Sequence, residues 1–333
     1  MPGPITHYLL GEKTINLLSD NAIQTAIREH RQVFNLGTQG PDIFFYYRVW
    51  PWTKNDGKEI IGDRLHEENI QAFFAQVIDY ALNRKETERN LLFSYLAGYL
   101  CHYALDIYTH PYIFYRTGFL RPGESPTSKY IYQHRIVETN VDFLMLKMLM
   151  SMKPFDLKIN KLIFVQHKEA ESIGKMYEEA LPRIFSEKIS SRQVYQAIKD
   201  MVRVQTVLRD RWGLKKKIIC WIEKKLGHYP LISSVIYPTD IKDCLDYLNV
   251  QHKFWLLPWD RSGKETLSFP ELFDLATQEA KELCMVLFRC LNGQLDIDFV
   301  LDRIGNRSFS TGIDCSSDIE FRYFEDIFDS SIN

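Results

Sequence analysis

Histidine and acidic residues stand four positions apart at two places in the first half of the chain. His102, Asp106 and His110 form one series, and His134 and Glu138 form the other. On a helix, residues at i, i+4 and i+8 lie on one face. Zinc binds imidazole nitrogen and carboxylate oxygen at about 2.0–2.2 Å, so such pairs are natural chelates. The spacing predicts metal ligands on two helices.

The first series requires more than one metal ion. Eight residues of helix rise about 12 Å, so His102 and His110 cannot bind the same ion. Asp106 lies between them, and its two carboxylate oxygens could bind one ion or bridge two. An unpaired carboxylate inside an apolar helix is strongly disfavoured, and a metal is one way to stabilise it. A hydrogen-bonded core histidine is the alternative for any single pair, but three coupled spacings favour metal.

The helices that would carry these residues are strongly apolar. Residues 87–110 are apolar on nearly all sides, which is typical of a central, buried helix. Because Pro111 disfavours helical geometry in the residue before it, we expect this helix to end near His110. A second strong helix is predicted over residues 128–152.

A further helix is predicted to begin at Asp63, as N-cap, and to reach Leu82. His66 would then lie in its first turn, where the helix dipole favours the neutral, metal-binding imidazole.

The rest of the chain also has helical periodicity, without an alternating strand pattern of any length. A loop is predicted at 121–126 from its Pro and Gly content. We therefore predict an all-α, multi-helix bundle with metals between its central helices, as a single domain over residues 1–333. Other helices are expected at 7–18, 20–34, 169–186, 191–212, 214–226, 239–252 and 269–293.

Composition limits the functional classes. The chain has 333 residues, 45% hydrophobic and 25% charged, as in soluble globular proteins. The formal net charge of -2 argues against nucleic acid as a partner. No apolar stretch is long enough for a transmembrane helix, and the N-terminus does not resemble a secretory signal. Six scattered cysteines without a CxxC pair favour free thiols, so we expect a cytoplasmic protein.

Asp42 lies in a Gly-Pro loop, where a carboxylate can reach into a cleft as a metal ligand, a general base or both. Aromatic residues follow it directly. Their faces can hold a quaternary ammonium headgroup by cation–π attraction or stack on a base; a hydrophobic loop covering the core is the alternative. The candidates for substrate contact are Phe44, Tyr46 and Tyr47.

Two other features extend the predicted site. Asp142, one turn beyond Glu138, is either a hydrogen-bond partner of His134 and its neighbours or a solvent-exposed residue. Residues 209–226 form a basic amphipathic segment with tryptophans. Such a segment suits peripheral contact with an anionic membrane, here at the inner membrane surface, or packs its apolar side on the domain.

The ordered set of candidate ligands resembles zinc-dependent bacterial phospholipase C, with good coverage over residues 1–140. Later segments at 254–259 and 308–312 resemble the intracellular, signal-less branch of that family. The motifs that carry the resemblance are Thr6-His7-Tyr8, Gly40-Pro41-Asp42-Ile43-Phe44, His66, His102-x3-Asp106-x3-His110 and His134-x3-Glu138.

The resemblance implies three zinc ions in an all-helical fold shared with P1-type nucleases. It assigns Asp42, His66, His102 and Asp106 to one ion, His110, His134 and Glu138 to a second, and His7 with a shared Asp106 to a third.

The N-terminus departs from the family pattern. Secreted members use the amine and carbonyl of an N-terminal Trp as ligands, whereas no Trp precedes His7 here. Removal of Met1 would offer the amine of Pro2 instead, and a third site that stays empty is the alternative. We therefore expect two or three Zn²⁺ ions.

The implied activity is metal-assisted hydrolysis of a phosphoester, in which metal-activated water cleaves a phospholipid headgroup. Two alternatives use the same ligands: a nuclease or phosphatase, and a non-catalytic metal-bound scaffold. The sequence leaves open the headgroup, the oligomeric state and the function of residues 150–333.

Overall fold

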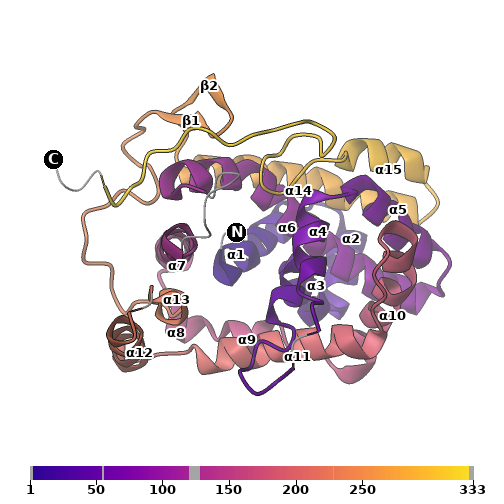
Figure 1. Ribbon diagram of the computed structural model, residues 1–333. Helices are drawn as coiled ribbons and strands as arrows, with labels where there is room; N and C mark the ends of the chain where they lie inside the picture. The colour runs from indigo at the N-terminus through magenta and orange to yellow at the C-terminus, as the bar shows by residue number, and fades with distance from the viewer. Residues whose placement is uncertain (1–2, 55, 120–127, 228, 330–333) are drawn as a thin grey trace.

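The computed structural model describes residues 3–54, 56–119, 128–227 and 229–329 (Figure 1). Across these residues the fold is helical apart from one two-stranded hairpin, which confirms the predicted all-α class. No helix within the same ranges is long and apolar enough to cross a membrane.

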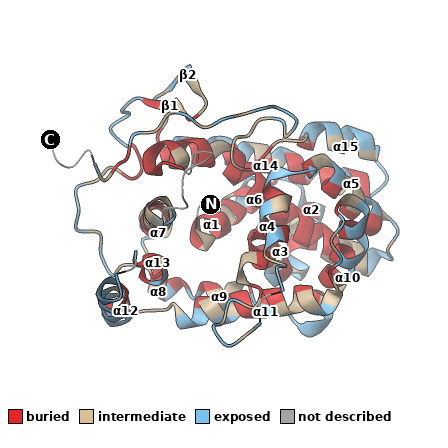
Figure 2. Cartoon of the chain, viewed as in Figure 1, coloured by how far each residue is buried: buried red, intermediate tan, exposed pale blue. Residues whose placement is uncertain are grey.

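A long helix, α6 (Glu86–Thr117), runs through the centre of the molecule and packs against α14 (Phe269–Leu291), α3 (Arg31–Gly37) and α7 (Ser128–Met150). Most of its residues after Leu91 are buried, as its apolar sequence predicts (Figure 2). The close approach of α3 depends on Gly98, since a Cβ there would collide with the backbone of α3.

The predicted end of this helix near His110 is wrong, because α6 continues through Pro111 to Thr117. Proline removes only the hydrogen bond that its N–H would give to the carbonyl of Ile107. Side chains on both sides of the proline, including Ile107 and Ile113, are buried in the core. Their packing holds the helical geometry that the local sequence disfavours.

The predicted helix from Asp63 to Leu82 is two helices, α4 (Ile60–Glu67) and α5 (Ile70–Leu82). They are separated at Asn69, whose φ of 55° is left-handed. Asp63 is therefore inside α4 rather than its N-cap, and His66 lies in the last turn. At that end the helix dipole does not favour neutral imidazole, so the expected reason for neutrality of His66 is wrong.

Near the N-terminus, the helix predicted at 7–18 is α1 (Pro4–Leu17), which begins earlier because Pro4 suits the first turn. The helix predicted at 20–34 is divided into α2 (Asn21–Glu29) and α3, with non-helical backbone at His30.

The loop predicted at 121–126 lies outside the described residues. After it, five other predicted helices are present with shifted ends. These helices are α7, α10 (His167–Ile184), α11 (Ser191–Val207) and α12 (Leu214–Lys225), followed by α14. Elements that the sequence did not predict are η1 (Gly40–Tyr46), α8 (Pro154–Leu157), α9 (Ile159–Leu162), α13 (Leu231–Ser234) and α15 (Ile297–Ile304).

The helix predicted at 239–252 is wrong, since this segment forms bends and turns. Asp246 accepts hydrogen bonds from the backbone N–H groups of Val250 and Gln251, both at 2.9 Å. Such local side-chain bonds compete with helical hydrogen bonding. The antiparallel hairpin β1 (Trp255–Leu257) and β2 (Asp260–Glu265) follows it and was also not predicted.

One contiguous hydrophobic core includes residues from Ile5 in α1 to Ile327 near the C-terminus. The second half of the chain therefore packs on the same core as the helices of the first half, and Figure 2 shows buried residues on α10, α11 and α14.

Candidate metal centre

The eight predicted ligands gather beside the central helix, on elements far apart in the sequence. Three groups of them have ligand atoms within 4.8 Å of one another. The side chains are His7 on α1, Asp42 on η1, His66 on α4, His102, Asp106 and His110 on α6, and His134 and Glu138 on α7.

The first group is Asp42, His66 and His102. His66 Nε2 lies 3.3 Å and His102 Nε2 3.8 Å from Asp42 Oδ1. Donor atoms in a tetrahedron around one zinc ion lie about 3.3–3.6 Å apart. The group therefore has nearly the spacing that a single ion requires.

Asp106 stands between the groups and is fully buried. Its Oδ2 lies 3.0 Å from His102 Nε2, whereas its Oδ1 lies 3.4 Å from His7 Nε2 and 3.8 Å from His110 Nε2. Burial raises the pKa of Asp106, and the His102 imidazole opposes this shift. The two oxygens face different histidines, so this carboxylate could offer one oxygen to each of two metal ions.

Three histidines are oriented by backbone carbonyls. Their Nδ1 atoms donate to Gly62 O for His66 (2.7 Å), to Thr38 O for His102 (3.1 Å) and to Phe309 O for His110 (2.7 Å). Because a carbonyl only accepts, Nδ1 carries the proton and Nε2 keeps its lone pair in the neutral ring. This bond, rather than the helix dipole, makes His66 a suitable ligand.

Several converging atoms fit a cation. Among the described residues, His66 Nε2, His110 Nε2 and Asp106 Oδ1 make no hydrogen bond. Buried polar atoms without partners are rare because they cost free energy. Imidazole and carboxylate donors in this arrangement suit Zn²⁺.

The group of His110, His134 and Glu138 joins α6 to α7. His134 Nε2 lies 2.7 Å from Glu138 Oε1. Burial lowers the pKa of His110 well below its usual range and also lowers that of His134. Neutral rings are the form that binds metal.

His7, His102 and Asp106 form the third group. For this group the sequence did not decide which atoms replace the N-terminal Trp ligands of the secreted family members. The His7 ring stacks on that of His102, with centroids 3.9 Å apart. Met1 and Pro2, whose amine was the predicted substitute for the family's Trp, lie outside the described residues.

Asp142 is fully buried, so the solvent-exposed alternative does not hold. It accepts hydrogen bonds from Ile5 N (3.1 Å), Thr6 N (2.7 Å), Thr6 Oγ1 (2.6 Å) and Tyr237 Oη (2.6 Å). Burial raises its pKa to about 6. Asp142 thus holds the start of α1, the helix that carries His7.

Phe309 is the main residue of the site that sequence reasoning missed. It lies in a loop, residues 308–312, which we call the C-terminal brace. Phe309 O accepts from His110, Phe309 N donates to His66 O (2.9 Å), and its ring lies 4.9 Å from the His66 ring. The Ser-Phe-Ser-Thr-Gly resemblance indicated this segment without a role.

A cavity of about 490 Å³ adjoins the centre, with Asp42 and Glu138 in its wall. Of the three aromatic candidates for substrate contact, Tyr46 lies on this wall. Phe44 is fully buried and packs against the ring of Tyr177. Tyr47 is also buried, and its hydroxyl donates a hydrogen bond to Asp56.

The family model described as zinc dependent phospholipase C matches residues 6–200, more than half of the chain. The chain belongs to the zinc-dependent phospholipase C family. Searches of curated proteins and of solved structures found no match.

All eight predicted ligands fall within the segment that matches zinc-dependent phospholipase C. The zinc dependence of this family agrees with the histidine and carboxylate groups described above. The C-terminal brace and the part of the cavity wall beyond residue 200 lie outside the match.

Proposed function

We propose that this protein is a zinc-dependent hydrolase of the phospholipase C type, which cleaves the phosphoester of a phospholipid headgroup. The observation that carries the proposal is the presence of three His/carboxylate groups beside a cavity: two of them share His102, and the third reaches Asp106 through His110, whose Nε2 lies 3.8 Å from Asp106 Oδ1. The family membership supports the same reaction.

The residues in these groups would hold two or three zinc ions. One set is Asp42, His66 and His102 with Asp106; a second is His110, His134 and Glu138; the third is His7 with His102 and Asp106. Bound zinc supplies a Lewis acid that makes water a nucleophile near neutral pH and neutralises phosphoryl charge.

We assign Asp42 the proton-accepting role, in addition to metal binding. Its carboxylate is buried beside His66 but lines the cavity, so it can reach both the ion and the attacking water.

Tyr46 and Arg135 line the same cavity and can bind the phosphoryl oxygens. Burial raises the pKa of Tyr46, so its hydroxyl stays protonated and able to donate. Arg135 Nη1 donates a hydrogen bond to Leu231 O at 3.1 Å. The other N–H groups of this guanidinium can donate to a phosphate oxygen.

A direct test compares substrates on the zinc-loaded protein: phosphatidylcholine, single-stranded DNA and a generic phosphodiester. We expect headgroup release from the lipid to be fastest. Preference for DNA or for the soluble diester would favour the nuclease or phosphatase alternative. Bound zinc without turnover of any substrate would favour the non-catalytic scaffold.

We also propose peripheral membrane contact through residues 209–226. This segment exposes large apolar side chains: Trp212, in the bend before α12, is 72% exposed, and Trp221 on α12 is 62% exposed. The exposed lysines of α12 are Lys217, Lys224 and Lys225. Tryptophan and lysine on one exposed helix suit an anionic bilayer.

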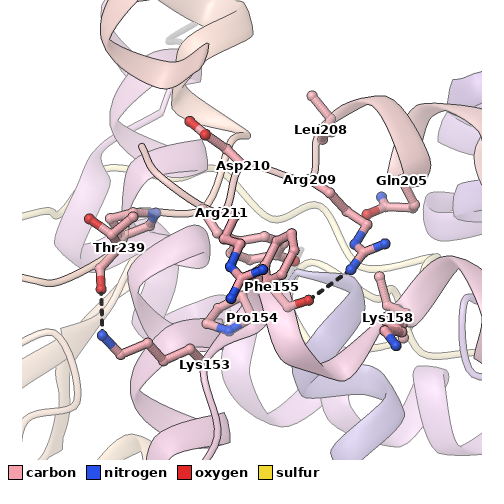
Figure 3. A pocket seen from close by; sticks show the side chains of 13 residues that line it. Lys153, Pro154, Phe155, Lys158, Gln205, Leu208, Arg209, Asp210, Arg211 and Thr239 are labelled. Atoms are coloured by element: carbon pink, nitrogen blue, oxygen red, sulfur yellow. Dashed lines mark hydrogen bonds between the residues drawn. The ribbon is translucent and has the colours of Figure 1, made fainter. Parts of the chain in front are cut away.

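The turn that leads into α12 adds positive charge. Figure 3 shows Arg209 and Arg211 gathered with Lys153 around Phe155, at a small hollow of about 80 Å³. Arg209 Nη2 donates to Phe155 O at 3.2 Å, and the guanidinium groups of Arg209 and Arg211 lie 4.5 and 5.7 Å from the Phe155 ring centroid. These cationic side chains, held in place by their contacts with Phe155, support an anionic surface as the partner.

We propose a cytoplasmic location, at the inner membrane surface. The six cysteines, all free thiols, support a reducing compartment.

A further inference from the structure

The cavity beside the metal centre has walls of two kinds. Its volume of about 490 Å³ is in the range of sites for small ligands. Part of the wall is charged or polar, and a larger part is aliphatic or aromatic. The apolar wall is formed by Phe45, Val49, Trp50, Val204, Val207, Leu208, Ile232 and Val235.

The polar lining residues lie together. The hydroxyl of Tyr46 accepts from Gln205 Nε2 at 3.1 Å and interacts electrostatically with Asp42, Arg135 and Glu138. Asp42 and Glu138 also belong to the groups that would hold zinc. The polar part of the cavity is therefore the part next to the candidate metal ligands.

The apolar part reaches the surface. Three of its residues are about half exposed: Val49 at 51%, Val207 at 54% and Ile232 at 58%. Large apolar side chains grouped at the entrance of a cavity are typical of a binding site for an apolar ligand. Ile232 follows α12 closely in the chain, so the proposed membrane-contact segment leads directly into this wall.

We infer that this cavity holds an acyl chain of the lipid substrate while the phosphoester lies at Asp42, Arg135 and Glu138. The inference rests on the proposed function and specifies its substrate class. An amphiphile matches both kinds of wall, whereas a free headgroup would leave the apolar wall without contacts. Phe45, Val49 and Trp50 lie within the family match, whereas Val204, Val207, Ile232 and Val235 lie beyond it, so one side of the apolar wall comes from the part of the chain outside the match.

The test measures kcat/KM on monomeric phosphatidylcholines that carry butanoyl, hexanoyl or octanoyl chains, with p-nitrophenylphosphorylcholine as the ester without acyl chains. Each methylene that enters the cavity should raise kcat/KM about fourfold. Binding of dioctanoylglycerol, measured by calorimetry on the zinc-loaded protein, provides a readout that does not depend on turnover.

Val204→Phe and Val235→Phe should fill the cavity from different elements. We expect the rise with chain length to stop at a shorter chain, and dioctanoylglycerol binding to weaken at least tenfold, while the ester without acyl chains is hydrolysed as before. Val250→Phe, at a position 60% exposed and outside the cavity wall, is the matched control.

Hydrolysis of the ester without acyl chains, with no dependence on chain length and no diacylglycerol binding, would overturn the inference and leave the proposed function standing. Diacylglycerol binding that persists equally in both Phe variants would also overturn it, because the chain would then lie elsewhere. Absence of hydrolysis of every ester would contradict the proposed function instead.

Discussion

At the residue scale, Asp106 links the candidate ligand groups, because its two oxygens face His102 on one side and His7 and His110 on the other. Asp106→Asn would replace one of these oxygens with an amide nitrogen that cannot bind metal. We expect zinc content to fall and activity to fall with it by at least about 100-fold. Metal analysis and turnover on phosphatidylcholine measure the two effects.

Asp298→Asn, at an exposed position on α15, is the control and should retain zinc and activity. Full zinc content in Asp106→Asn would contradict the bridging role, whatever happens to the rate.

Asp142 provides a pH-dependent prediction. Its pKa rises from 3.8 to about 6 on burial, so the folded state holds this proton more tightly than the unfolded chain. Its contribution to stability is present in full below the unfolded pKa and is lost as pH rises through the folded pKa. The loss is about 3 kcal/mol. Asp142→Asn lacks this titration.

Denaturant unfolding of the zinc-free wild type and Asp142→Asn at several pH values measures the effect. Between about pH 4 and pH 7 the wild type should lose about 2 kcal/mol of unfolding free energy relative to Asp142→Asn. Parallel pH curves for the two proteins would refute the assignment.

At the scale of elements, the C-terminal brace orients ligands from α4 and α6. Gly312 lets it pack on the central helix, since a Cβ there would lie 2.6 Å from Ile107 O. Gly312→Ala should displace Phe309 O from His110 and weaken zinc affinity about 10- to 100-fold. Competition with a chelating indicator measures this affinity.

Gly293→Ala is a matched control, because both glycines have a φ of 70° but a Cβ on Gly293 meets nothing within 4 Å. Both variants bear the cost of a left-handed alanine, about 1–2 kcal/mol. Equal zinc affinities in the two variants would show that the brace does not position the ligands.

Element boundaries show where local reasoning failed. Helical periodicity located α6, α7 and α14, because an apolar face repeats along the segment itself. The continuation of α6 through Pro111 depends on packing against distant segments. The turns at 239–252 depend on side-chain bonds to the local backbone.

At the scale of the whole molecule, the exposed segment made of Trp212 and α12 should bind anionic vesicles. Trp212→Ser and Trp221→Ser should each reduce binding about tenfold or more, since each removes a large apolar side chain from the interface. Lys217→Gln should reduce it about fivefold on anionic vesicles alone. Co-sedimentation with anionic and neutral vesicles measures both effects.

Phe299→Ser is the control, because Phe299 is 50% exposed on α15, away from this face. Binding that is insensitive to both the tryptophan and the lysine variants would argue against membrane contact through α12. Hydrolysis of p-nitrophenylphosphorylcholine should be unchanged in all of them.

The sequence by itself determined the helical class and the ligand types, because period and i,i+4 spacing are local properties of a helix. It also placed His102, Asp106 and His110 on one helix face and showed that His102 and His110 are too far apart to bind the same ion. Tertiary structure decided how Asp106 is shared, how Phe309 orients His110 and where the cavity lies. These features depend on contacts between residues far apart in the chain, such as His110 and Phe309 at 199 positions, which pattern and spacing do not encode.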